Sequence, residues 1–250
     1  SLTNGLRDLS RRQGCTLFMT ALTALLTLLH RYTGETDIAI RPQVAGRDEV
    51  ELEDLVGLFI KTIVLRCDMS GDPDFTQLLT RVRATVLETF EHLSMPLDKL
   101  IELLKPKRDL SRNALFSVNF IFQRSFISNE NYGSFKLIDL PSRSSGAQHD
   151  LNFFMVERPE GWRVSCEYNT DLFEQSTVAR LLDHFVNLLQ VIVADPQQHI
   201  SALTMLDPQE RHELIVERNQ TGAAYPQQLT LPELFAAQAA STPDALAVVC

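Results

Sequence analysis

The chain has 250 residues, of which 44% are hydrophobic and 22% are charged, and its formal net charge is −9. This composition is typical of a globular protein with one large domain or one and a half. The negative charge argues against nucleic acid as a partner, because phosphate binding needs concentrated Lys and Arg. The four cysteines lie far apart with no Cys-x-x-Cys pair, so we expect no metal site and a reduced, cytoplasmic chain.

The first two predicted elements are helices. Leu2–Gln13 predicts a helix that ends at Gly14, and Thr16–Tyr32 predicts a second one. The second helix follows Arg11-Arg12 and is strongly apolar, so it superficially resembles a twin-arginine export signal. Its apolar run, Leu17–Leu29, contains Thr20, Thr23 and Thr27 and lacks a small-residue cleavage site, which favours a buried core helix and no membrane segment.

Strands and a long helix are predicted next. Asp37–Gln43 predicts a short strand, and Leu58–Cys67, rich in β-branched residues, predicts a longer one. Asp72-Pro73 predicts the N-cap and first position of an amphipathic helix that runs to about His92. A short helix is expected over Leu97–Leu104, after a proline.

The next predicted elements are four strands and one long helix. The strands are expected at Phe116–Gln123, Phe135–Leu140, Leu151–Glu157 and Trp162–Tyr168. Apolar residues at helical spacing predict an amphipathic helix over Gln175–Ala194. After Asp195-Pro196 we expect a short helix at Asp207-Pro208, a loop over Asn219–Gln228 and a helix at Leu231–Ala240. Mixed strands and helices of this kind indicate an α/β sandwich.

Familiar catalytic motifs are absent from the sequence. There is no nucleophile elbow, phosphate-binding loop or zinc-binding His-Glu-x-x-His. Six histidines are present, but none stands in a His-x-x-x-Asp-Gly frame. His149, next to Asp150 and just before a predicted strand, is a candidate for a functional cleft, whereas His184 reads as a satisfied surface or core histidine.

A charged turn runs directly into the strand predicted from Phe116. We expect Arg108, Asp109 and Arg112 to form a local charge network, with Ser111 in the same turn, that holds Asn113 toward a cleft. The alternative that this turn is purely architectural stays open, because Arg–carboxylate pairs are more often scaffolding than chemistry.

This turn and several other segments resemble motifs of the condensation domains of nonribosomal peptide synthetases, which make antibiotics and other secondary metabolites. Arg108–Leu115 is similar to the family's Arg-Asp-x-Ser-Arg-Asn-Pro-Leu motif. The other similar segments, in the family order, are Ala45–Arg47, Val56–Thr62 with Arg66, Ser94–Asp98 and Tyr168–Phe173. The resemblance implies an α/β fold of the chloramphenicol-acetyltransferase-like (CoA-dependent acyltransferase) sandwich type, of which this chain would be the C-terminal subdomain only.

The resemblance also implies residues near a substrate tunnel. The residues that would line the tunnel or have a structural role in these motifs are Gly57, Phe59, Lys61, Thr62, Arg66, Arg108, Asp109, Ser111, Arg112 and Asn113. Two departures from the family pattern stand out. Lys61 replaces the usual Asn, and Arg41-Pro42 stands where Gly-x-Pro is common. The family's His-His-x-x-x-Asp-Gly motif does not occur, so no catalytic residue is assigned.

The resemblance implies the following organisation. Residues 1–206 would be the C-terminal lobe of a condensation domain, 207–228 a linker, and 229–250 the truncated start of an adenylation domain. The partners would be the N-terminal lobe, the adjoining adenylation domain and peptidyl carrier domains, with the phosphopantetheine arms of the carriers as the only cofactors. We expect no metal, no nucleic acid and no membrane.

Three functional interpretations compete. The chain is half of an amide-forming enzyme that is inactive alone, or a noncatalytic docking module for carrier proteins, or a free-standing chloramphenicol-type acyltransferase. The third would need its own catalytic histidine motif within the chain. Restoring activity with the missing lobe separates the first two interpretations.

Overall fold

The computed structural model describes most of the chain and divides it into two units. The described residues are 1–46, 50–52, 54–107, 113, 115–124, 135, 146–158, 161–223 and 228–248. The first unit is Ser1–Asp207 and the second is Pro208–Cys250. Each unit is described by itself.

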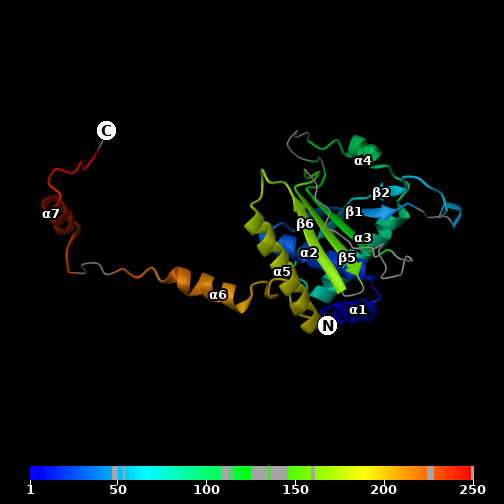
Figure 1. Cartoon of the computed structure of the whole chain (residues 1–250), viewed down its shortest axis with the longest axis horizontal. Helices are drawn as coiled ribbons and strands as arrows, with labels where there is room; N and C mark the ends of the chain where they lie inside the picture. Colours follow the sequence, from blue (N-terminus) through cyan, green and yellow to red (C-terminus); the bar gives the residue numbers. More distant parts are fainter. Residues whose placement is uncertain are drawn as a thin grey trace. The chain divides into compact units, whose positions relative to one another are not determined.

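A mixed β-sheet organises the first unit (Figure 1). Its strands are β1 (Asp37–Ala45), β2 (Ile60–Thr62), β3 (Leu65–Asp68), β4 (Val118–Arg124), β5 (Leu151–Arg158) and β6 (Gly161–Tyr168). The order is β2-β1-β4-β5-β6, and β3 pairs with β1. β1, β4 and β5 are parallel, whereas β2, β3 and β6 are antiparallel to their neighbours.

The single strand predicted over Leu58–Cys67 is wrong in one respect, because the structure has two strands there. Both pair with β1 in the same register, since Gln43 faces Thr62 and Ile40 faces Leu65. In that register Pro42 faces Ile63, whose N–H donates to the carbonyl oxygen of Pro42 at 3.4 Å. Proline has no N–H to return that bond, and the ladder is interrupted over Arg41 and Pro42, between β2 and β3.

Helices α1 (Leu2–Arg12) and α2 (Leu17–Thr33) confirm the first two predictions. The side chain of Thr16 accepts the N–H of Met19 at the start of α2, and Gly34 ends the helix with φ +73°. Thr20, Thr23 and Thr27 of α2 are fully buried, but their hydroxyls are hydrogen-bonded. Thr27, for example, donates its hydroxyl to the carbonyl oxygen of Thr23 at 2.8 Å.

Helix α3 (Phe75–Glu91) begins two residues later than predicted. Its N-cap is Asp74, which accepts the N–H of Gln77 while the Gln77 side chain accepts the N–H of Asp74. Asp72, the predicted cap, has φ +43° and instead accepts hydrogen bonds from the N–H and hydroxyl of Ser201. The Asp-Pro pair therefore anchors the chain after α5, and the next Asp starts the helix.

Helices α4 (Leu97–Leu104) and α5 (Gln175–Ala194) have their predicted bounds. By length and composition α5 could cross a membrane, and α1 with α2 could do so only as one span, which their 105° bend interrupts. The apolar face of α5, including Phe185, Leu188 and Ile192, is buried in the core. Core packing thus accounts for its composition.

The core lies on one face of the sheet. Phe120 of β4 and Phe153 of β5 are both 1% exposed, and Ile40 of β1 is fully buried. Because side chains alternate along a strand, their sequence neighbours lie on the opposite face. Helices α2, α3 and α5 supply most of the other buried leucines and phenylalanines of this core, and α1 adds Leu6 and Leu9.

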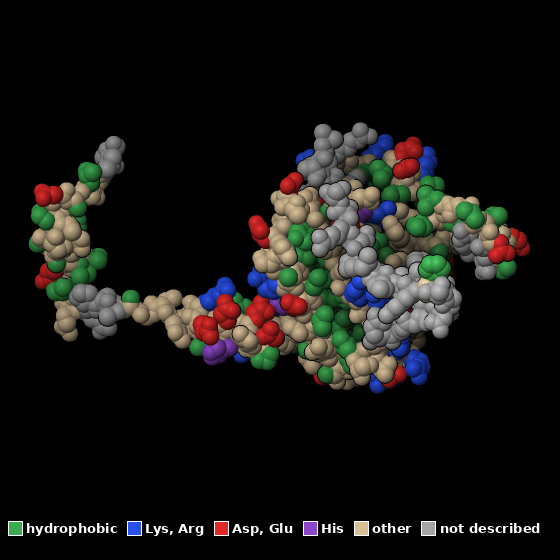
Figure 2. Space-filling model, viewed as in Figure 1, with side chains coloured by type: hydrophobic (Ala, Val, Ile, Leu, Met, Phe, Trp, Pro, Cys, Tyr) green, Lys and Arg blue, Asp and Glu red, His purple; other side chains and the backbone are tan. Residues whose placement is uncertain are grey.

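The second unit is mostly helical. It contains α6 (Pro208–Ile215), a 3-10 turn at Glu217–Asn219 and α7 (Leu231–Ser241), which confirms both predicted helices. Figure 2 shows charged side chains gathered along α6, where Arg218 pairs with Glu213 at 2.8 Å. The strand predicted over Phe135–Leu140 lies outside the described residues except for Phe135.

Candidate functional site

A row of polar side chains crosses the sheet on the face opposite the core. Arg41 faces Asn119, Asn119 faces Asn152, and Asn152 faces Glu167 on four successive strands. We call this surface the polar face. Asn119 is 1% exposed and Asn152 is 8% exposed, so their amides need hydrogen-bond partners.

Hydrogen bonds orient the two side-chain amides in this row. The amide nitrogen Nδ2 of Asn152 donates to Oε2 of Glu167 at 3.4 Å, and Nδ2 of Asn119 donates to Oδ1 of Asn152 at 2.7 Å. Because a carboxylate only accepts, it fixes the orientation of both amides. Oδ1 of Asn119 is therefore left buried, with no partner among the described residues.

Arg41 lies at the β1 end of the row, and its contacts among the described residues are with neutral groups. Its Nη1 donates to Nε2 of His149 at 2.8 Å, and its Nη2 donates to the hydroxyl of Thr62 at 2.8 Å. Its guanidinium lies over the ring of Phe116, 5.5 Å from the centroid. Among the described residues, no acidic side chain forms an ion pair with Arg41.

His149 is held as a neutral imidazole. An Arg N–H always donates, so Nε2 of His149 accepts and its proton resides on Nδ1. The amide nitrogen Nδ2 of Asn113 lies 3.3 Å from Nδ1, so the ring N–H would find an acceptor there only with the amide turned to present its oxygen. Burial lowers the pKa of His149, and the charge of Arg41 lowers it further, while Asp150 and Glu167 act in the opposite direction.

The structure brings two of the predicted site residues together. Thr62 and Asn113 lie around Arg41 and His149, although they come from different motifs. Arg108, Asp109, Ser111 and Arg112 lie outside the described residues, so the predicted charge network stays a prediction.

The other predicted residues lie apart from Arg41 and His149. Lys61 is on the opposite face of β2 from Thr62, and its stem lies against Gly46, where a Cβ atom would be 2.9 Å from Lys61 Cγ. Arg66 is exposed and bonds Asp37 through two hydrogen bonds of 2.8 and 2.7 Å. Gly57 and Phe59 lie in the segment before β2, where a Cβ atom on Gly57 would be 3.2 Å from the Phe59 ring.

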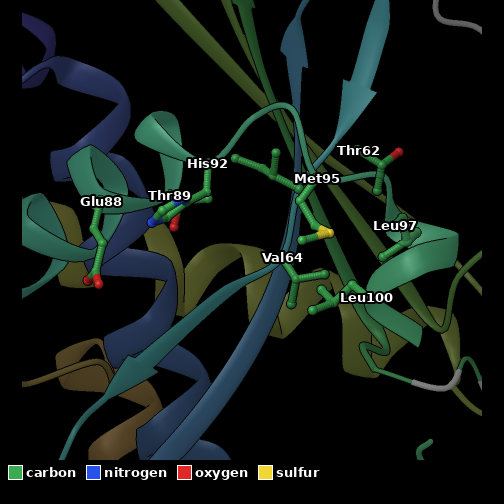
Figure 3. A pocket seen from close by; sticks show the side chains of 9 residues that line it. Thr62, Val64, Glu88, Thr89, His92, Met95, Leu97 and Leu100 are labelled. Atoms are coloured by element: carbon green, nitrogen blue, oxygen red, sulfur yellow. The ribbon is translucent and has the colours of Figure 1, made fainter. Parts of the chain in front are cut away.

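A cavity of about 250 Å³ opens next to Thr62 (Figure 3). Its walls come from β2, the segment before β3, the end of α3, and α4. The apolar lining residues are Ile63, Val64, Met95, Leu97 and Leu100, and the polar ones are Thr62, Glu88, Thr89 and His92. Figure 3 shows Glu88 and Thr62 on opposite sides of the cavity.

The described residues form neither a metal-binding group nor an activated thiol at Cys67 or Cys166. Within the described residues, no group of three His, Cys, Asp or Glu side chains is placed to hold a metal ion. Burial raises the pKa of Cys67 and of Cys166 to about 12, so both remain protonated thiols at neutral pH.

Sequence reasoning missed Arg41 as a site residue and gave His149 only a minor place. A signal for Arg41 was present, because an arginine between Ile40 and Pro42 interrupts an apolar strand. No local signal pairs it with His149, which lies 108 residues further along the chain. His184, read as a satisfied histidine, is 5% exposed and hydrogen-bonds the hydroxyl of Tyr32 at 2.5 Å.

Comparisons with known proteins identify the family. The model of the condensation domain matches residues 1–215, so the chain belongs to the condensation domain family. The chain is 42% identical over its whole length to a linear gramicidin synthase protein of Brevibacillus parabrevis, and it spans 3% of that protein. It is 37% identical to surfactin synthase subunit 1 of Bacillus subtilis, over 96% of this chain and 7% of that one.

Solved structures agree with the predicted fold. A four-domain nonribosomal peptide synthetase, holo-AB3403, matches with a TM-score of 0.76 at 24% identity, over 83% of this chain and 17% of that one. The X-domain from teicoplanin biosynthesis matches with a TM-score of 0.71 at 28% identity, over 82% of this chain and 47% of that one. The predicted chloramphenicol-acetyltransferase-like α/β fold is therefore confirmed, and the chain spans a small part of the curated relatives it matches.

Proposed function

We propose that residues 1–206 are the C-terminal lobe of a condensation domain in a nonribosomal peptide synthetase. The main support is the extent of the structural match. About four fifths of this chain matches only 46% of the condensation domain of the polyketide synthase MokA, with a TM-score of 0.72, as expected for one lobe of such a domain. The condensation motifs in the first 206 residues also stand in the family order. Residues 207–228 would link this lobe to an adenylation domain that starts at 229–250.

The reaction of the complete domain would be amide formation. The amine of an acceptor aminoacyl thioester attacks the carbonyl carbon of a donor thioester, the C–N bond forms, and the carrier thiol leaves. Both substrates would be carried on phosphopantetheine arms of carrier domains, in the cytoplasm. The upstream lobe would supply the histidine motif, since no His-His-x-x-x-Asp-Gly occurs here.

In this proposal the polar face supplies walls and hydrogen bonds, and no proton transfer is assigned to it. His149 has its Nε2 occupied by Arg41, so its lone pair is not available to take a proton from an amine. Thr62 and Asn113 would line the substrate tunnel, and Gly57, Phe59, Lys61 and Arg66 would shape or support its rim.

Complementation tests this function. The chain is mixed with a separately produced upstream lobe and with two carrier domains loaded with amino acids, and dipeptidyl-thioester is measured by mass spectrometry. We expect product only when both lobes are present, and none when the upstream lobe lacks its motif histidine. Turnover by this chain alone would contradict the proposal. Tight carrier binding with no turnover in any combination would instead support a noncatalytic docking module.

A further inference from the structure

Arg41 is a half-buried cation that has no acidic ion-pair partner among the described residues. Its hydrogen-bond partners among the described residues are a neutral imidazole and a hydroxyl. A guanidinium carries more N–H donors than these two acceptors use, and Nε of Arg41 is buried with no partner in the part of the chain that the structure describes. Burial also lowers the pKa of Arg41. A desolvated cation of this kind is stabilised by binding an anion.

The guanidinium is also held in place. Two hydrogen bonds and the Phe116 ring fix its plane, so little side-chain entropy remains to be lost on binding. Arg66 on the same face offers a contrast, since it is exposed and already paired with Asp37. Of these two arginines, Arg41 is the one that is held in one orientation and has no acidic partner among the described residues.

The position of Arg41 indicates what the anion is attached to. Thr62 accepts from Arg41 and also lines the 250 Å³ cavity. Val64, another wall of the cavity, lies two residues after Thr62 in the segment between β2 and β3. Apart from Thr62, the wall on this side is apolar, and the acidic Glu88 comes from α3 on the far side. An anionic end at Arg41 and an aliphatic body in the cavity fit this arrangement.

We propose that Arg41 and the adjoining cavity form a subsite for a carboxylate-bearing aliphatic group, such as an acidic side chain of a carrier-bound substrate. A phosphopantetheine arm shares the anionic chemistry and carries a dimethyl-substituted carbon beside its phosphate, so it is the competing occupant. Tighter binding of free phosphopantetheine than of hexanoate would overturn the assignment. The assignment to a substrate rests on the proposed function, whereas binding of a free aliphatic carboxylate does not.

Binding is tested on the isolated chain with isotope-labelled arginine, by NMR of the guanidinium signals. Sodium acetate, butanoate and hexanoate are titrated at constant ionic strength, with 1-hexanol and inorganic phosphate as comparison probes. We expect saturable shifts of the Arg41 signal, assigned by its loss in Arg41→Lys, with affinity rising up to about fourfold for each buried methylene. The alcohol should leave the signal in place.

Two variants complete the binding test. Arg41→Gln should abolish the response of the cavity residues to hexanoate, and the matched variant Arg66→Gln should retain it. If Arg41→Gln does not fold, the chain-length series on the unmodified protein still decides. Equal shifts at Arg41 and Arg66, or no dependence on chain length, would overturn the proposal. A stronger response to phosphate than to hexanoate would overturn it in favour of a phosphate site.

The substrate assignment is tested in the two-lobe reaction. Glutamyl and glutaminyl thioesters are compared, and Arg41→Gln should lower the ratio of their rates by about tenfold, the loss expected for one charge-assisted hydrogen bond. An unchanged ratio with intact hexanoate binding would overturn the substrate assignment alone. No turnover in any mixture would contradict the proposed function while the binding result stands.

Discussion

The two faces of the sheet are built on different principles, although the same strands supply both. On the core face, Phe120 and Phe153 are in register and fill volume against the helices. On the polar face, Asn119 and Asn152 are also buried but are held by a hydrogen bond between their amides. Apolar packing tolerates any partner of the right size, whereas the amide row requires particular atoms at particular places. The core face should therefore govern stability, and the polar face should govern specificity.

The largest expected effect is on the core face. Phe120→Ala should lower the free energy of unfolding by about 3–5 kcal/mol, because it leaves a cavity in a closed core. The matched variant Ile121→Ala, one residue along and on the polar face, should cost less than half as much, since Ile121 is only partly buried. Urea denaturation followed by circular dichroism measures the free energy of unfolding of both variants. Equal losses would contradict the assignment of stability to the core face.

A smaller effect on stability is expected for Asn119 and Asn152, and the effects of the two substitutions should be coupled. Asn119→Ala removes the donor to Oδ1 of Asn152 and should cost about 1–3 kcal/mol. The double variant with Asn152→Ala should cost less than the two single losses added together, because each single variant leaves an unsatisfied partner. Additive losses in the denaturation midpoints would show that the two amides act independently.

The helix that covers the core face has its own test. Asp74→Ala should destabilise the chain by about 1 kcal/mol, because it removes the N-cap of α3. Asp74→Asn should change little, since asparagine is an equally good N-cap. The same denaturation measurement applies, and a full loss in Asp74→Asn would assign the effect to charge instead of capping.

The smallest expected effect concerns the protonation of His149. Its pKa should lie below the ordinary value of 6.5, because burial and the neighbouring Arg41 disfavour the imidazolium. Below that pH the unfolded chain takes up more protons, so this residue should reduce stability as the pH falls from 6.5 through the folded pKa. NMR titration of the ring measures the pKa, and Arg41→Gln should raise it. A rise on removing Asp150 instead would invert the assigned electrostatics.

Helices were predicted well because their limits are encoded locally. Thr16 and Gly34 at the ends of α2, and Pro96 before α4, act through their own backbone neighbours. The strand break was missed because its cause, Pro42, lies on the partner strand. The site was predicted only in part for the same reason, since Thr62 and Asn113 stand in recognisable motifs while Arg41 and His149 gain meaning only from the sheet pairing.

The contact between Arg41 and His149 joins residues 108 positions apart, through a strand order in which β4 must lie between β1 and β5. Loop closure over such a distance is entropically costly, so this contact should form late in folding, after the parallel pairing is complete. Until then the guanidinium remains hydrated and unoriented. A partly folded chain in which the parallel strands have not yet paired would therefore not bind the aliphatic carboxylate selectively. Selective binding would require the complete sheet.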